Sequence, residues 1–211
     1  MKRTLAAIVA ILAWVGLTMQ FYLTLTHPPA PEVPVAERII RFFSFFTIIS
    51  NLIVAIVTTA IAFFKGSRVE RLVNRTSVLA AIAVYITIVA AVYSLFLRAV
   101  VNPQGWHLVS DHFIHDIVPP AYVLFWLIFA PKKGVRWADP VKWLIVPILY
   151  IAYSLTHGAY DNWYPYWFAD VSKLGYPTAL KNSAFVLIAF LVVGLIYAGV
   201  AKLISLAAKS A

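Results

Sequence analysis

The sequence contains no cysteine, and few of its residues carry a charge. Without cysteine the chain has no disulfide, no thiol nucleophile and no thiolate metal ligand. Charged residues make up only 12% of the 211 residues, about half of the usual fraction in a soluble domain. Hydrophobic residues make up 63%. A soluble globular domain is therefore excluded as the main body of the chain.

The apolar residues gather in six runs of about 17 to 26 residues, the length that crosses a bilayer of about 30 Å as a helix. The runs are Leu5–Leu25, Ile39–Phe64, Ser77–Leu97, Phe113–Phe129, Val141–His157 and Ala179–Leu203. The first resembles a signal peptide, but it is longer than a signal core and lacks a small-residue cleavage site, so we expect a span. The sequence predicts an all-α polytopic membrane protein with six transmembrane helices, forming one domain over residues 1–211.

Lysine and arginine are distributed unequally between the two ends of the predicted spans. Twelve of the 17 lie on the side of the two termini, namely Lys2, Arg3, Lys65, Arg68, Arg71, Arg75, Lys132, Lys133, Arg136, Lys142, Lys202 and Lys209. The other side carries five, which are Arg38, Arg41, Arg98, Lys173 and Lys181. Because the more basic side of a membrane protein faces the cytoplasm, both termini are predicted to be cytoplasmic.

The net charge of +9 suits contact with anionic lipid headgroups. The basic residues are scattered over short loops without a nucleic-acid-binding module, so we expect no nucleic-acid partner. The side opposite the termini carries six of the eight acidic residues and all five histidines. Titratable chemistry is therefore expected in the non-cytoplasmic half of the protein.

The second run, FFSFFTIISNLIV at 42–54, carries four polar residues. On one helix, Ser44, Thr47 and Asn51 share a face and Ser50 lies beside them, so the stripe should face the bundle. With a helix that starts at Ile39, Thr47 would lie roughly 12 Å deep in the outer half of the membrane. Hydroxyl groups in membrane helices also bond back to the preceding turn, and asparagine also joins helices, so each residue alone has a structural explanation.

A second polar cluster, SDHFIHDIVPP at 110–120, opens the fourth run. His112 and Asp116 are one helical turn apart, and so are Asp111 and His115. Ser110 or Asp111 is expected to cap the helix. The two prolines leave carbonyls without partners and predict a kink. An ionisable residue in a membrane span is a candidate functional residue.

The two clusters together suggest acyl-transfer chemistry. His115 could accept the proton of the Thr47 hydroxyl during attack, and Asp111 or Asp116 could orient the imidazole. Asn51, one turn below Thr47, could donate to a developing oxyanion. A long-chain acyl ester would be a natural substrate, because it partitions into the bilayer. No cofactor is expected for this chemistry.

Three motifs resemble the family of six-span androgen-induced and androgen-dependent membrane proteins and their bacterial relatives. They are FFTIISN at 45–51, HFIHDIVPP at 112–120 and YPYWFADVSKLGY at 164–176. The animal members hydrolyse fatty acid esters of hydroxy fatty acids with an intramembrane threonine and histidine. The resemblance implies Thr47 as nucleophile and His115 as base, with His112 as a competitor, in a bacterial inner membrane. Asn51, Asp116 and Asp170 are added by the physical argument alone, and Ser50 and His112 are further supporting residues.

Two other functions remain open from the sequence. Six spans with a polar cavity open to the outside would also suit a lipid-binding protein or a transporter, although no inverted repeat is evident. A metal site could use His112, His115 and Asp116, since imidazole and carboxylate suit zinc, with His107 or His157 as a further ligand.

Overall fold

The computed structural model describes residues 1–210, and side chains over residues 1–208. It is 82% helical and has no strand within those residues, which confirms the all-α prediction. Five helical segments are long and apolar enough to cross a membrane: Lys2–Thr26, Phe46–Phe63, Thr76–Val101, Trp106–Phe129 and Val171–Ala208. The chain is therefore treated as an integral membrane protein.

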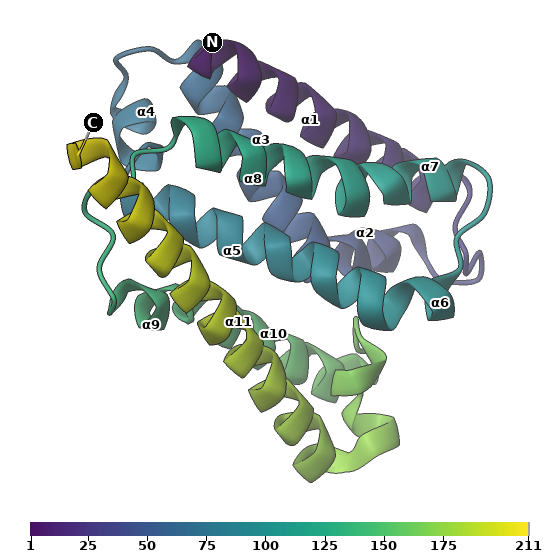
Figure 1. The fold of residues 1–211 in the computed structure, drawn as a ribbon. Coiled ribbons are helices and arrows are strands. Elements are labelled where there is room, and N and C mark those ends of the chain that lie inside the picture. The colour runs from purple at the N-terminus through teal and green to yellow at the C-terminus, as the bar shows by residue number, and fades with distance from the viewer. Residues whose placement is uncertain (211) are drawn as a thin grey trace. The chain divides into compact units, whose positions relative to one another are not determined.

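The chain forms two compact units, Met1–Gly134 and Val135–Ala211. The first unit (Figure 1) contains α1 (Lys2–Thr26), α2 (Val35–Phe43), α3 (Phe46–Phe63), α4 (Arg68–Val73), α5 (Thr76–Val92), α6 (Arg98–Val101), α7 (Trp106–His112) and α8 (Val118–Phe129). Two π-helical turns, η1 (Tyr93–Leu97) and η2 (Phe113–Ile117), join α5 to α6 and α7 to α8. The third span is thus α5–η1–α6, and the fourth is α7–η2–α8.

The first residues of α1 contact α4 and Asn74, the residue that follows it. Lys2 donates to the Asn74 side chain at 2.9 Å, and Arg3 forms an ion pair with Glu70 at 2.6 Å. Figure 1 shows α4 beside the N-terminal end of α1, whereas α2, α6 and α7 lie toward the opposite end. Within this unit, the N-terminus and α4 therefore lie at the same end of the helices.

The second predicted span is not one helix. Phe45 is extended (φ −80°, ψ 128°) and separates α2 from α3. Phe42 packs against Phe21 of α1 at 5.1 Å, whereas Phe46 packs against Tyr85 of α5 at 6.2 Å. Aromatic side chains on the two sides of the break are thus held by different helices, and this tertiary packing overrides the continuous helical pattern.

The break corrects two expectations from the sequence. Ser44 ends α2, where its hydroxyl donates to the Ile40 carbonyl at 2.8 Å, so it does not share a helix with Thr47 and Asn51. Thr47 is the second residue of α3 and of the candidate span. It therefore lies near the end of that span and not one-third of the way through it.

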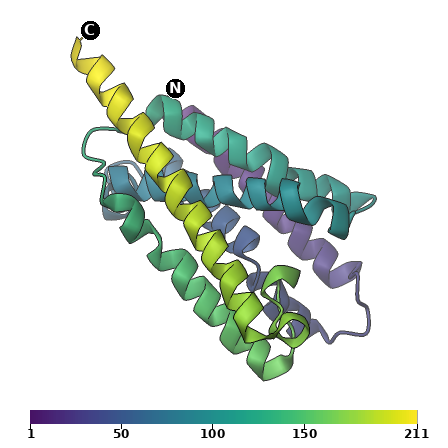
Figure 2. The ribbon, with the colours of Figure 1, turned by 60° about the horizontal axis from the view of Figure 1, so that its bottom comes forward.

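The second unit (Figure 2) contains α9 (Asp139–Trp143), α10 (Ile145–Asp161), the 3₁₀ turn η3 (Trp167–Ala169) and α11 (Val171–Ser210). Gly175 interrupts α11 with φ 71°, a conformation that glycine adopts without strain. Asp170 accepts from the Ser172 N–H at 3.1 Å. Burial raises the pKa of Asp170, but hydrogen bonds from Ser172 and Lys173 outweigh burial, so its pKa is lowered.

The fifth predicted span, Val141–His157, is divided between α9 and α10. α10 has 17 residues, and it is not among the five segments long enough to cross a membrane. Pro147 explains the division, because it has no N–H to donate to the Trp143 carbonyl at the end of α9. The structure therefore shows five of the six predicted spans as segments of full length, and the fifth predicted span is not among them.

Candidate active site

Thr47 has a hydroxyl that is not bonded to its own helix. Thr58, further along α3, donates to the carbonyl of Val54 four residues earlier, at 2.7 Å. The equivalent carbonyl for Thr47 belongs to Phe43, on the far side of the extended Phe45. Among the described side chains, the Thr47 hydroxyl forms no hydrogen bond, and the residue is 8% exposed. The helix break therefore leaves the hydroxyl of a mostly buried residue without a bond to its own helix.

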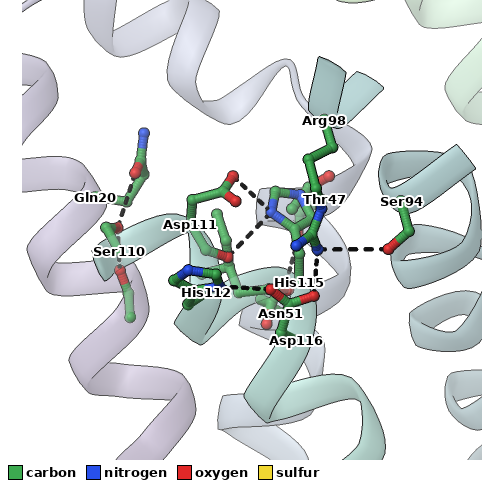
Figure 3. A network of polar contacts seen from close by, with 12 residues as sticks. Gln20, Thr47, Asn51, Ser94, Arg98, Ser110, Asp111, His112, His115 and Asp116 are labelled. Carbon is green, nitrogen blue, oxygen red and sulfur yellow. Dashed lines mark hydrogen bonds and ion pairs between the residues drawn. The ribbon is translucent and has the colours of Figure 1, made fainter. Parts of the chain in front are cut away.

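Asn51 connects Thr47 to the fourth span. Its amide nitrogen donates to the Thr47 carbonyl at 2.9 Å and to the Ile114 carbonyl at 3.1 Å. The two carbonyl oxygens lie within about 6 Å of each other, because one nitrogen bonds both. Ile114 directly precedes His115. The contact therefore brings the backbone of α3 at Thr47 close to the backbone of the fourth span at His115 (Figure 3).

The same contact corrects the role expected for Asn51. A side-chain amide has two hydrogens, and both are used by backbone carbonyls. Asn51 therefore joins two helices and has no donor left for an oxyanion in this conformation. Its Oδ1 is buried without a hydrogen bond, and so is the hydroxyl of neighbouring Ser50. Two unpaired polar atoms thus lie about one helical turn from Thr47 in α3.

His115 is held by Asp111. Its Nδ1 lies 3.0 Å from Asp111 Oδ1 and 3.2 Å from the Asp111 carbonyl oxygen. Both partners are acceptors when the carboxylate is ionised, so the hydrogen-bond network assigns the proton to Nδ1. The lone pair is then on Nε2. The side chains of His115 and Asp111 are only 8% and 10% exposed, so the pair is shielded from bulk solvent.

Asp116 does not orient His115, although the sequence left that role open. One of its oxygens pairs with Arg98, and the other lies 2.6 Å from His112 Nδ1. Arg98, Asp116 and His112 form a second cluster, and their side chains are 41%, 32% and 45% exposed. Figure 3 shows the two clusters side by side, with Arg98 reaching Asp116 from the third span. The structure therefore separates a buried pair, Asp111–His115, from a more exposed triad, Arg98–Asp116–His112.

Tyr93 is a site residue that the sequence did not identify. Its ring stacks on His115 with centroids 3.6 Å apart and planes 9° apart. Arg98 also approaches the Tyr93 ring, at 5.1 Å from its centroid. Tyr93 is the first residue of η1, at a position in the third span that no local motif distinguishes. Only the packing of the third span against the fourth could have shown its role.

The first helix positions the fourth span from the other side. A Cβ atom at Gly16 would lie 2.8 Å from Phe113 Cβ, so only glycine allows this approach. Ser110 is completely buried and donates to the Gln20 side chain at 2.8 Å (Figure 3). The sequence suggested that Ser110 or Asp111 caps this helix. That expectation is wrong, because α7 begins at Trp106 and both residues lie inside it.

The histidines are distributed over separate contacts. His107 bonds the His27 carbonyl at 2.8 Å, and His157 lies 3.5 Å from Asp161 in the second unit. Over the described part of the chain, no group of three or more His, Asp or Glu side chains is placed to hold a metal ion. The arrangement that fits the side chains is instead a hydroxyl and an imidazole–carboxylate pair on neighbouring helices.

Comparisons with known proteins add no further constraint. No protein-family model, no curated protein and no solved structure matches the chain.

Proposed function

We propose that this protein is an intramembrane hydrolase of long-chain lipid esters. Thr47 supplies the nucleophilic hydroxyl and His115 acts as the general base. Asp111 orients His115, and Asn51 fixes the distance between α3 and the fourth span. The observation that carries the proposal is the buried Asp111–His115 pair, tied to the backbone of Thr47 through Asn51.

The chemistry follows from these roles in two steps. His115 Nε2 takes the proton of the Thr47 hydroxyl as its oxygen attacks the acyl carbonyl, and the alcohol leaves with that proton. The acyl group is then bound to Thr47 as an ester. A water molecule attacks this ester while His115 takes its proton, which releases the fatty acid and restores the hydroxyl. Each step needs one base. His115 supplies it in this proposal, because its imidazole is buried and its backbone lies close to that of Thr47.

The substrate class and the membrane arrangement belong to the same proposal. Thr47 lies near the end of a candidate span, where the ester of a lipid can be reached while its acyl chain stays in the bilayer. Large apolar side chains such as Ile11 and Phe185 are exposed on α1 and α11, which suits lipid contact. We infer six spans, both termini in the cytoplasm and a bacterial inner membrane, with fatty acid esters of hydroxy fatty acids as the first substrates to test.

The test is hydrolysis by the purified protein in lipid micelles. Release of free fatty acid from a long-chain ester is measured for wild type, Thr47→Ala, Thr47→Ser and His115→Ala. Thr47→Ala should abolish turnover, and His115→Ala should lower it by about 10²–10⁴-fold, the usual contribution of a general base. Thr47→Ser should retain part of the activity because it keeps the hydroxyl.

His112→Ala is the matched control for His115→Ala. His112 is one of the two histidines in this segment, but it is half exposed and pairs with Asp116. The His112→Ala variant should keep most of the activity, and a chelator should not change the rate.

A fluorophosphonate adduct on Thr47, located by mass spectrometry, would identify the nucleophile. If both alanine variants at Thr47 and His115 remain fully active on every ester tested, the proposed function is wrong. If wild type hydrolyses no ester but retains bound lipid, the protein is a lipid binder.

A further inference from the structure

Two π-helical turns occur in the candidate active site. In η1 the N–H of Arg98 bonds the carbonyl of Tyr93, and in η2 the N–H of Val118 bonds the carbonyl of Phe113. These bonds span five residues in place of the usual four, and single π turns inside α-helices are often found at functional sites. One turn lies in the third span and the other in the fourth, and the two spans pack together.

The two turns have different local causes. η2 is followed by Pro119 and Pro120, which have no N–H for the carbonyls of His115 and Asp116. The prolines therefore account for the irregular hydrogen bonding of the fourth span. η1 has no proline in or directly after it. Its distinguishing feature is that its first residue, Tyr93, stacks on His115, which lies in the middle of η2.

The stack restricts His115 in a way that Asp111 alone does not. A hydrogen bond from Nδ1 to Asp111 selects one edge of the imidazole, but the ring can still tilt about that bond. The Tyr93 ring, almost parallel at 3.6 Å, fixes the plane. Tyr93 is 3% exposed, and its hydroxyl interacts with the Asp111 carboxylate without reaching hydrogen-bond geometry. The aromatic face is therefore the part of Tyr93 in direct contact with His115.

We propose that Tyr93 is a positioning residue that holds the His115 imidazole in one plane, so that Asp111 keeps the proton on Nδ1 and the lone pair on Nε2. The face of the ring does this, and the hydroxyl is not required. The effect on turnover rests on the proposed function, because it needs His115 as the base. The effect on the tautomer of His115 does not depend on any activity.

The test compares Tyr93→Phe with Tyr93→Leu in two measurements. NMR of protein labelled with ¹⁵N-histidine, in micelles, reports the tautomer of His115, whose signals are assigned by their loss in His115→Gln. Tyr93→Phe should retain the Nδ1–H tautomer and a kcat within about threefold of wild type. Tyr93→Leu should give a mixture of tautomers and lower kcat by about tenfold or more, with KM changed by less than about twofold.

Tyr122→Leu is the matched control. Tyr122 is a completely buried tyrosine of α8, and its hydroxyl donates to the Leu79 carbonyl at 3.3 Å, outside the His115 cluster. It should lose stability like any large-to-small core substitution while retaining the tautomer and kcat. The proposal requires Tyr93→Leu to differ from Tyr122→Leu in the tautomer and in kcat, and not only in melting temperature. If Tyr93→Leu does not fold, Tyr93→Met removes the same aromatic face with an unbranched side chain.

The outcomes separate the two proposals. If Thr47→Ala abolishes hydrolysis but Tyr93→Leu changes neither kcat nor the tautomer, Tyr93 is structural and the proposed function stands. If wild type hydrolyses nothing, the tautomer of His115 in Tyr93→Phe and Tyr93→Leu still decides the role of Tyr93. If Tyr93→Phe behaves like Tyr93→Leu, the hydroxyl is the required group and the assignment to the ring face is overturned.

Discussion

The side chain of Asn51 hydrogen-bonds the backbone of Ile114 across two helices while it also bonds the carbonyl of Thr47 in its own helix. The distances from its amide nitrogen are 3.1 and 2.9 Å. The reversed amide would place Oδ1 against two carbonyl oxygens, so the orientation is fixed by the partners. Asn51 is fully buried. It therefore holds the candidate nucleophile and the candidate base in neighbouring positions.

Asn51→Ala should lower the stability of the protein. The substitution leaves the Ile114 carbonyl without the Asn51 donor, and such losses cost about 1–3 kcal/mol when the group stays buried. Thermal unfolding in detergent, followed by circular dichroism, should show a lower midpoint. Hydrolysis should also fall, because the spacing of Thr47 and His115 depends on the same contact.

Ser50→Ala is the control for this prediction. Ser50 is 2% exposed, and its hydroxyl has no hydrogen bond in the described structure. Removing an unpaired buried hydroxyl is expected to be neutral or stabilising. An equal loss of stability in Ser50→Ala and Asn51→Ala would mean that the interhelical bonds of Asn51 are not the source of the effect.

Asp111→Asn and Asp116→Asn should differ in their effects on hydrolysis. Asp111 contacts His115, whereas Asp116 contacts Arg98 and His112. Asp111→Asn can present an amide hydrogen to Nδ1 and so favour the wrong tautomer, which should lower kcat by about 10²–10⁴-fold. Asp116→Asn should leave kcat within about threefold of wild type. Initial rates at saturating ester measure both, and a larger loss in Asp116→Asn would reverse the assignment.

Part of this site could be predicted from the sequence, because helical periodicity is local. Residues four apart face each other, so both pairs, Asp111–His115 and His112–Asp116, were predicted and both are present. The burial of Thr47 and Asn51 also follows from a polar stripe in an apolar run. The choice of Asp111 over Asp116 could not be predicted, because it depends on the rotation of the fourth span against its neighbours.

The remaining features depend on contacts between helices. The extended Phe45 follows from aromatic packing against two different helices, and the sequence around it is continuously apolar. Tyr93 and Arg98 lie in the third span, and their spacing in sequence from His115 and Asp116 follows no period. The approach of Gly16 to Phe113 likewise joins segments far apart in the chain. Single-sequence patterns carry no information on these pairings.

Lys132 should make stability depend on pH in an alkaline range. Its ammonium lies just beyond α8 and donates to the carbonyls of Leu127 and Ala130 at 3.2 and 2.6 Å, and also to that of Trp126. Burial lowers the pKa of Lys132 from 10.5 to about 8. Between these values the unfolded chain binds a proton that the folded protein lacks, so the free energy of unfolding rises with pH.

Melting temperatures of wild type and Lys132→Met, measured from pH 7 to 10.5, test this. The midpoint of wild type should rise relative to that of Lys132→Met as the pH increases from about 8. The control is Lys133→Met, at an exposed neighbouring lysine, and the difference between its midpoint and that of wild type should not follow this trend. A difference that moves in the opposite direction would mean that the carbonyl contacts keep the ammonium charged and that its pKa is not lowered.

The segment from Asp139 to Asp161 determines on which side the C-terminus lies. α10 alone is about 25 Å long, shorter than a hydrocarbon core of about 30 Å. α9 precedes it with only Leu144 between, and Leu144 is in the right-handed helical region (φ −67°, ψ −16°). The two helices together therefore have the length to cross a membrane, despite the missing Pro147 donor.

Reporter fusions distinguish six spans from five. With six spans and the predicted sidedness, green fluorescent protein at the N-terminus and at the C-terminus should fluoresce, because it folds in the cytoplasm. Alkaline phosphatase inserted in the aromatic loop after Asn162 should be active, because it requires the non-cytoplasmic side. With five spans the two termini would lie on opposite sides, and one fluorescent fusion would be dark. Lysine and arginine are retained in the cytoplasm, but they divide twelve to five with six spans and also with five, because Lys173 and Lys181 exchange sides with Lys202 and Lys209. This bias therefore does not decide between the two arrangements, and the fusions do. Replacing Lys132, Lys133, Arg136 and Lys142 with glutamine removes that bias from the loop before α10, and only then should the C-terminal fusion lose fluorescence.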